Sequence, residues 1–236
     1  MIAGLSKAVT LYLAPLLSLT AILLSLFAYL SPVVLLSDRV ALLTVLPSTA
    51  LTQANGPKVD GVSMFLGALG SCSRPDNAAD INCTTPSLSP VYDLSDLPSN
   101  APQLTLSAPP SSSPAFIAVS LVISILFFFT FTMISLRHKM GEKLAGAMDK
   151  PAIQRISAWL GFFGFFIGLT TFLILRMLMG KSVDDFNNAI ISMGSGGPQL
   201  VAATGNGFIM IWVAYAFYAV PVIASLTKIN VTQTKA

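Results

Sequence analysis

Residues 114–136 read PAFIAVSLVISILFFFTFTMISL, a run of 23 residues without one charged side chain. A helix that crosses the hydrocarbon core of a bilayer needs roughly 20 predominantly apolar residues. The run stops at Arg137, His138 and Lys139, and basic residues gather at the cytoplasmic ends of membrane spans. The stretch therefore predicts a transmembrane helix with its C-terminal end in the cytoplasm.

The same pattern occurs three more times, over residues 8–30, 156–176 and 208–227. No span has an ionisable residue near its centre, which argues against a proton relay, a voltage sensor or an ion pathway. The first run could instead be a cleaved signal peptide. Its apolar run exceeds the roughly 7–15 residues of the apolar region within a signal peptide, so we expect a retained helix.

The composition agrees with a membrane protein. Apolar residues make up 54% of the 236 residues and charged residues 10%, against about 25% charged in soluble proteins. So few charges cannot cover a soluble globule, which argues against a soluble enzyme, a nucleic-acid binder and a disordered chain. The net charge of +3 is too small to predict polyanion binding. We expect an all-α membrane protein built on a four-helix transmembrane bundle.

The distribution of Lys and Arg predicts the orientation. Residues 137–155, together with Lys7, Lys228 and Lys235, hold eight basic and two acidic side chains, whereas the opposite side holds five basic side chains and eight aspartates. Both termini should therefore be cytoplasmic. The expected parts are the N-terminus and first helix (1–36), first outer loop (37–113), second helix (114–136), inner loop (137–155), third helix (156–176), second outer loop (177–207), fourth helix (208–227) and C-terminus (228–236).

The first outer loop divides by composition. Residues 33–48 are rich in Val and Leu and predict one or two strands. Residues 84–114 are dense in Ser, Thr and Pro, which predicts a flexible stalk open to O-glycosylation. The second outer loop, residues 177–207, is rich in Gly and Asn and is expected to be irregular.

Cys72 and Cys83 are the only two cysteines, eleven positions apart on the side predicted to be oxidising. A structural disulfide is the natural interpretation. Metal binding would need two further ligands, and the single histidine, His138, is expected on the other side of the membrane. We therefore predict a disulfide and no metal site.

Two glycosylation sequons are present. Asn82-Cys83-Thr84 lies in the first outer loop, and Asn82 is a candidate acceptor unless early disulfide formation at Cys83 blocks it. Asn230-Val231-Thr232 is expected in the cytoplasm, where it would not be modified.

Gly161, Gly164 and Gly168 fall near one face of the third expected helix. Small residues at this spacing let a neighbouring helix approach closely. Packing within one bundle is the simpler interpretation, and a dimerisation face is the alternative.

The inner loop carries five basic side chains that could attract anionic lipid headgroups, each worth about 1 kcal/mol near the surface. The simpler interpretation is that they only set the topology. These residues are Arg137, Lys139, Lys143, Lys150 and Arg155.

No pattern of catalytic residues is present. Asp184 and Asp185 are adjacent in a polar stretch, whereas an intramembrane aspartyl protease needs its two aspartates in separate helices. No GxSxG or HExxH motif occurs. We therefore expect neither an enzyme nor a cofactor.

The order of parts resembles the claudin-type four-span architecture. Claudins carry Gly-Leu-Trp, two residues, Cys, and a second Cys about ten residues later; here Gly67, Cys72 and Cys83 match this arrangement, and the tryptophan has no counterpart. Gly67, Gly70 and Cys72 form a Gly-x-x-Gly-x-Cys variant of it. With Tyr92-Asp93-Leu94 following, the pattern is similar to the fungal branch of cortical-patch (eisosome) and PalI pH-response membrane proteins, which also includes mating-associated calcium-influx regulators. The resemblance implies a small disulfide-pinned extracellular β-sheet in the first loop.

The resemblance further implies a non-enzymatic organiser of the plasma membrane that assembles laterally, with roles in cortical membrane domains, the cell wall, pH response or mating. Its partners would be membrane lipids, a second copy or a larger integral membrane protein, and no nucleic acid. The alternative is an auxiliary or regulatory subunit of a channel, transporter or membrane-embedded synthase, because spans without internal charge suit either role.

Overall fold

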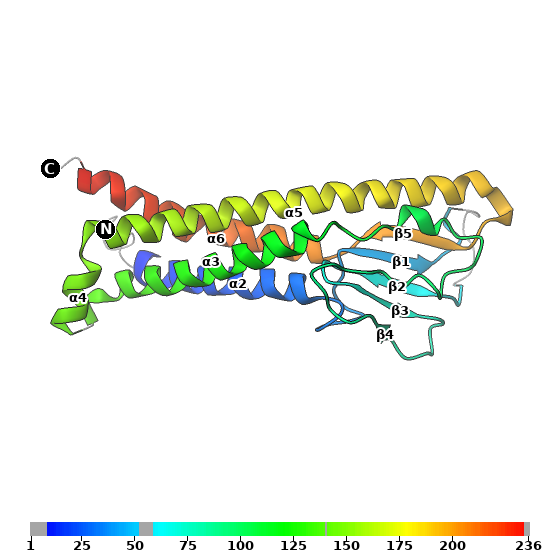
Figure 1. Ribbon diagram of the computed structural model, residues 1–236, viewed down its shortest axis with the longest axis horizontal. Helices are drawn as coiled ribbons and strands as arrows, with labels where there is room; N and C mark the ends of the chain where they lie inside the picture. Colours follow the sequence, from blue (N-terminus) through cyan, green and yellow to red (C-terminus); the bar gives the residue numbers. More distant parts are fainter. Residues whose placement is uncertain (1–8, 52–58, 140, 234–236) are drawn as a thin grey trace. The chain divides into compact units, whose positions relative to one another are not determined.

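The computed structural model describes residues 9–51, 59–139 and 141–233. Four described helices are long and apolar enough to cross a membrane, which supports a multi-pass membrane protein. The helices are a π-helical turn η1 (Val9–Leu13), α2 (Ala14–Leu30), α3 (Ser112–Ser135), α4 (Glu142–Met148), α5 (Pro151–Met193) and α6 (Gly207–Gln233), with 3-10 turns η2 (Gln103–Thr105), η3 (Arg137–Lys139) and η4 (Gly194–Gly196) (Figure 1).

The chain forms two compact units. Unit 1 contains Met1–Leu26, Phe116–Thr171 and Ile211–Ala236, and unit 2 contains Phe27–Ala115 and Phe172–Met210. The regular elements of unit 1 are all helices among its described residues, joined by short turns. Its buried core joins side chains from α2, α3 and α6, namely Ala14, Ala21, Phe127, Phe131, Ala214, Tyr218 and Val222.

Prolines in these helices stand where the backbone tolerates them. Pro151 is the first residue of α5 and Pro114 the third of α3, positions whose N–H groups have no partner inside the helix. Pro221 lies inside α6, as membrane helices allow when neighbouring groups satisfy the freed carbonyl.

Unit 2 is built around a five-stranded antiparallel sheet in the order β4-β3-β2-β1-β5. The expected sheet is therefore confirmed, but only four of its strands come from the first loop. The fifth, β5, comes from the second loop and pairs with β1 along its whole length. The strands are β1 (Leu43–Pro47), β2 (Ser63–Leu66), β3 (Ser71–Arg74), β4 (Asn82–Cys83) and β5 (Leu200–Thr204).

The expectation of an irregular segment over residues 177–207 is wrong. Helix α5 continues without interruption to Met193, so its 43 residues reach about 65 Å at 1.5 Å per residue (Figure 1). The reason is a helical apolar stripe, because Met179, Val183, Phe186 and Ile190 recur at helical spacing and all are buried. The helix ends where Gly194 adopts a positive φ of 59°.

The stalk predicted for residues 84–114 is also absent. Most of this segment lacks regular secondary structure, yet Leu97 and Leu106 are buried. The N–H of Ser87 donates to the carbonyl of Leu69, and the N–H of Asp93 donates to the Ser71 hydroxyl, which ties the segment to the β2–β3 hairpin. Serine and threonine predicted a solvated chain, whereas here the Thr84 hydroxyl donates to the Ser71 carbonyl and accepts from the Ser71 N–H, and backbone N–H groups make the other bonds to the hairpin.

Candidate functional site

The turn between β2 and β3 explains the two glycines of the loop motif. Residues 67–70 form a four-residue hairpin loop in which the N–H of Gly67 donates to the carbonyl of Gly70 at 2.9 Å. A Cβ at Gly67 would overlap the Ser31 carbonyl, and one at Gly70, whose φ is +156°, would overlap the Thr84 hydroxyl. Only glycine lets this hairpin tip pack so closely, which is why the tip is buried.

The disulfide between Cys72 and Cys83 is present, as predicted. The two residues face each other across the β3–β4 pair. Cys72 is buried and packs with Ala41 and Phe65, whereas Cys83 is exposed. Because β4 has only two residues, the bond holds a strand that its ladder hydrogen bonds alone would hold weakly.

Two polar side chains fasten the following segment to the sheet. The Tyr92 hydroxyl donates to the Gly67 carbonyl at 2.7 Å, and the Ser73 hydroxyl donates to an Asp96 carboxylate oxygen at 2.6 Å. Burial raises the pKa of Tyr92 above its ordinary value of about 10. The tyrosine of the Tyr-Asp-Leu element is thus a structural clamp on the glycine turn.

An asparagine of α5 closes the outer edge of the sheet. The Asn187 amide nitrogen donates to the carbonyl of Ala202 in β5, and its amide oxygen accepts from the N–H of the same residue, both at 2.9 Å. An unpaired strand edge invites pairing with another chain. At Ala202 this edge is satisfied by a side chain, which leaves β4 as the open edge.

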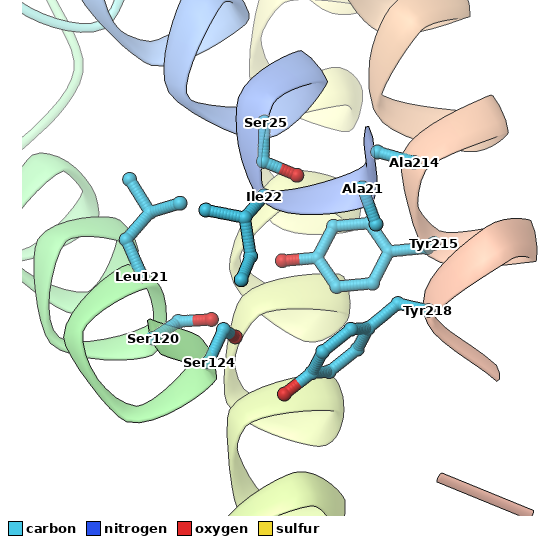
Figure 2. A pocket seen from close by; sticks show the side chains of 9 residues that line it. All are labelled: Ala21, Ile22, Ser25, Ser120, Leu121, Ser124, Ala214, Tyr215 and Tyr218. Atoms are coloured by element: carbon cyan, nitrogen blue, oxygen red, sulfur yellow. The ribbon is translucent and has the colours of Figure 1, made fainter. Parts of the chain in front are cut away.

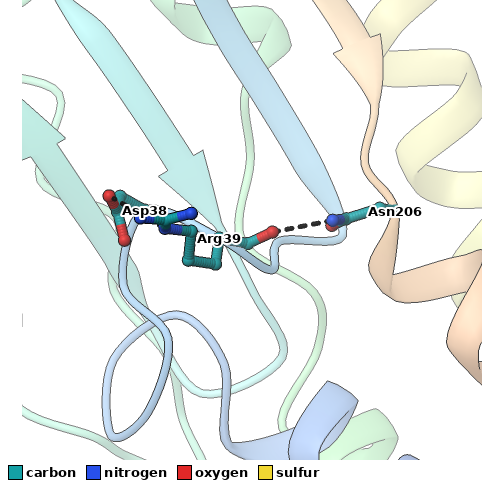
Figure 3. Close-up of polar contacts among 3 residues, drawn as sticks. All are labelled: Asp38, Arg39 and Asn206. Carbon is teal, nitrogen blue, oxygen red and sulfur yellow. Dashed lines mark hydrogen bonds and ion pairs between the residues drawn. The ribbon is translucent and has the colours of Figure 1, made fainter.

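A second asparagine joins the two loops at the other end of β5. Asn206 donates from its amide nitrogen to the Arg39 carbonyl at 2.7 Å and accepts from the N–H of Ala41 at 3.4 Å (Figure 3). The nearby Asp38–Arg39 ion pair, at 3.6 Å on the surface, contributes little stability. Sequence reasoning missed both asparagines, since an isolated Asn in a Gly-rich stretch is ordinarily a turn residue.

The glycine strip of α5 faces other helices of unit 1. A Cβ at Gly161 would lie 2.7 Å from Phe127 of α3. One at Gly164 would lie 3.2 Å from the Tyr218 hydroxyl of α6, and one at Gly168 would overlap the Tyr215 hydroxyl. The strip is therefore occupied within the chain, which leaves no room for the alternative of a dimerisation face there.

Hydroxyl groups bond across this close contact. The Ser120 hydroxyl of α3 donates to the Gly164 carbonyl at 2.8 Å, a bond that the missing side chain permits. Nearer the other end of α3, the hydroxyls of Thr130 and Ser157 lie 2.9 Å apart. Interhelical hydrogen bonds of this kind contribute about 0.6 kcal/mol each on average in membranes.

A small polar cavity lies beside these bonds, in the core of unit 1 (Figure 2). Its volume of about 10 Å³ is at the lower limit for one water molecule. Tyr215 and Tyr218 of α6 line it opposite Ser120 and Ser124 of α3, and the spacing of these serines, one helical turn apart, is the sequence signal that could have predicted it. The lining residues are Ala21, Ile22, Ser25, Ser120, Leu121, Ser124, Ala214, Tyr215 and Tyr218.

Two of the five basic side chains of the inner segment already contact other residues of the protein. Arg137 pairs with Asp149 at 2.7 Å, and the ammonium of Lys139 lies 5.8 Å from the ring centroid of Tyr12. The remaining three of the predicted headgroup contacts are exposed: Lys143, Lys150 and Arg155.

The remaining candidates lie apart from one another. Asn82 is exposed on β4, and Asn230 falls within α6. Asp184 and Asp185 are exposed on α5. Across the described residues, no group of three or more His, Cys, Asp and Glu side chains is placed to hold a metal ion.

The chain was also compared with known proteins. No protein-family model matches it, and no curated protein matches it.

Proposed function

We propose that this chain is a non-enzymatic, claudin-like organiser of the plasma membrane that assembles laterally with further copies of itself. The supporting observation is the pairing of β1 with β5, since it combines both outer loops into one sheet. A sheet whose β3–β4 pair is held by a disulfide and whose β5 is bonded to Asn187 is a rigid surface for contacts. In this proposal both termini are cytoplasmic and the sheet is extracellular.

An aromatic ladder on α5 supports lateral assembly. Trp159 stacks on Phe163 at 5.5 Å between ring centroids, and Phe162 stacks on Phe166 at 6.0 Å. Trp159, Phe163 and Phe166 are roughly half exposed. They flank the glycine strip, which is already occupied, so the ladder is an exposed apolar face of this helix. Rings that hold one another in place lose little side-chain freedom when another helix packs on them.

The test is purification of the full chain in mild detergent, followed by cross-linking and native gel electrophoresis. We expect oligomers of this chain alone, and we expect Phe163→Ala with Phe166→Ala to shift them toward monomers at an unchanged melting temperature. Phe116→Ala with Phe129→Ala on α3 is the matched control, since those rings are also exposed. Recovery of a larger membrane protein in fixed ratio would overturn self-assembly and favour an auxiliary subunit.

The orientation has its own test. An epitope at the C-terminus should resist protease added to intact cells, while an epitope in the outer sheet should be cleaved. Cleavage of the C-terminal epitope would overturn the proposed topology without bearing on self-assembly.

A further inference from the structure

A groove of about 400 Å³ lies on unit 2, between residues 104–110 and residues 178–185 of α5. Its volume falls within the range of roughly 300–1,000 Å³ that pockets for small molecules have. The wall formed by residues 104–110 includes Pro109 and Pro110, whose rings fix the backbone φ there. The side chain of Leu104 on the rim is 99% exposed.

The α5 wall carries one positive and one negative charge. Lys181 and Asp185 are four residues apart and so lie on the same helix face, about 6 Å apart along the axis. Both are exposed, yet they form no ion pair with each other. Ser182 also lines the groove and adds a hydroxyl. A ligand that bears a negative and a positive group a few ångströms apart would complement this wall.

Apolar side chains continue from the groove toward the membrane-spanning part of α5. Leu178 and Met179 line the groove. Leu173, Ile174 and Met177, which lie nearer the centre of the span, form an apolar strip whose exposed fractions are 46%, 49% and 75%. This strip and one wall of the groove belong to the same helix, α5. A ligand with an apolar tail could therefore lie along α5 while its polar end occupies the groove.

The height of the charges along α5 matches the headgroup layer. Apart from Arg176, the apolar run of α5 extends to Gly180, so Lys181 is the first residue beyond it and Asp185 lies about 6 Å further out. The polar layer on each side of a bilayer is about 5–8 Å thick, since it adds roughly 10–15 Å in total to a hydrocarbon core of about 30 Å. Both charged residues thus lie within about 7.5 Å of the end of the apolar run, at the level of the polar headgroups.

We propose that this groove binds one zwitterionic phospholipid, whose phosphate contacts Lys181, whose ammonium group contacts Asp185 and whose acyl chain follows the strip at residues 173–178. An extended peptide would also fit a groove of this size. The lipid is favoured because the two charges continue into an apolar strip at the depth where a lipid is present. The proposal needs α5 to cross the bilayer, and it does not need the chain to self-assemble.

Native mass spectrometry of the purified full chain with added lipids tests the site. The probes are phosphatidylethanolamine, phosphatidylcholine and phosphatidylglycerol with identical acyl chains. We expect one adduct per chain with the two zwitterionic lipids and at least several-fold weaker binding of phosphatidylglycerol, which lacks the ammonium group. Equal binding of all three lipids would overturn the proposal, because Asp185 would then have no role.

Substitutions locate the site. Asp185→Asn should weaken phosphatidylethanolamine about tenfold, the effect of losing one charge-assisted contact, and leave phosphatidylglycerol unchanged or stronger. Lys181→Met should weaken all three lipids.

Asp184→Asn and Arg39→Met are the matched controls, since each removes the same charge from an exposed residue outside the groove. They should change nothing, and melting temperatures confirm that every variant is folded. Equal losses in Asp184→Asn and Asp185→Asn would show that general charge, and not the groove, binds lipid. Lost lipid binding with intact oligomers would separate this site from the proposed self-assembly.

Discussion

Different interactions stabilise the interior of unit 1 and the interior of unit 2. In unit 1, a glycine strip lets α5 approach α3 and α6 until hydroxyls bond to backbone, as Ser120 bonds to Gly164. In unit 2, a disulfide, strand pairing and buried apolar side chains hold the sheet. We attribute the difference to the solvent that the apolar spans predict for each unit, since lipid removes the hydrophobic incentive for helices to associate and water restores it.

Polar side chains accordingly have different tasks in the two units. In unit 1 they add bonds to a contact that close packing has already made. In unit 2 they complete the backbone hydrogen bonding of the sheet, as Asn187 does at β5 and Tyr92 does at the glycine turn. We therefore expect substitutions in unit 1 to act through added volume and substitutions in unit 2 through lost bonds.

The largest effect is expected at the disulfide. Cys72→Ser with Cys83→Ser should lower the free energy of unfolding of unit 2 by roughly 2–4 kcal/mol, because the unfolded loop is no longer closed. Hydrogen exchange should show faster opening of β3 and β4, with little change in the helices of unit 1. If hydrogen exchange in the helices of unit 1 rises by the same factor as in β3 and β4, the two units unfold together, and the claim that they are stabilised separately is contradicted.

The second effect is expected from added volume in unit 1. Gly168→Leu would drive a side chain into Tyr215 and Ser120 and should cost about 1–3 kcal/mol, seen as a lower melting temperature in detergent. Gly164→Leu should cost less, because its contacts are looser. Phe163→Leu is the control on the exposed face of the same helix, and equal losses there would show that the strip is not a packing face.

The third effect is expected at the closed edge of the sheet. Asn187→Ala removes two hydrogen bonds and should destabilise unit 2 by roughly 1–2 kcal/mol, at about 1 kcal/mol for each bond. The exposed edge should also increase aggregation. Asn188→Ala, one position along the helix, is the control. If neither aggregation nor the melting temperature changes in Asn187→Ala, the pairing with β1 is enough to hold β5, and the role assigned to Asn187 is contradicted.

The smallest effect is expected at Tyr92, with a dependence on pH. Tyr92→Phe removes the bond to Gly67 and should cost about 0.5–1.5 kcal/mol at neutral pH. Because burial raises the pKa of Tyr92, its contribution is complete below about pH 10, the ordinary tyrosine pKa, and is lost as the pH rises above it. The stability difference between wild type and variant, measured by denaturant titration, should therefore shrink above pH 10. A difference that stays constant with pH would contradict this assignment.

Much of the architecture was predictable because membrane spans and cysteine pairs are local signals. Uninterrupted apolar runs indicated four long helices, and two cysteines on one side of the membrane indicated the disulfide. The spacing of Gly161, Gly164 and Gly168 indicated a close helix contact, although it could not indicate which helices would pack there. The composition of residues 84–114 wrongly predicted a solvated stalk, because composition does not show which hydroxyl and backbone groups will find hydrogen-bond partners on the sheet.

The amino-acid sequence by itself determined which segments avoid water, which residues are small enough for close approach and where a covalent bond can form. Only the tertiary structure decided that β5 joins a sheet from the other loop, that Asn206 bonds to Arg39, and that residues 104–110 form a groove with Lys181 and Asp185. The reason is separation along the chain. The β1–β5 pairing and the Asn206–Arg39 bond join residues more than 150 positions apart, and no local pattern encodes which distant backbone will supply the missing partner.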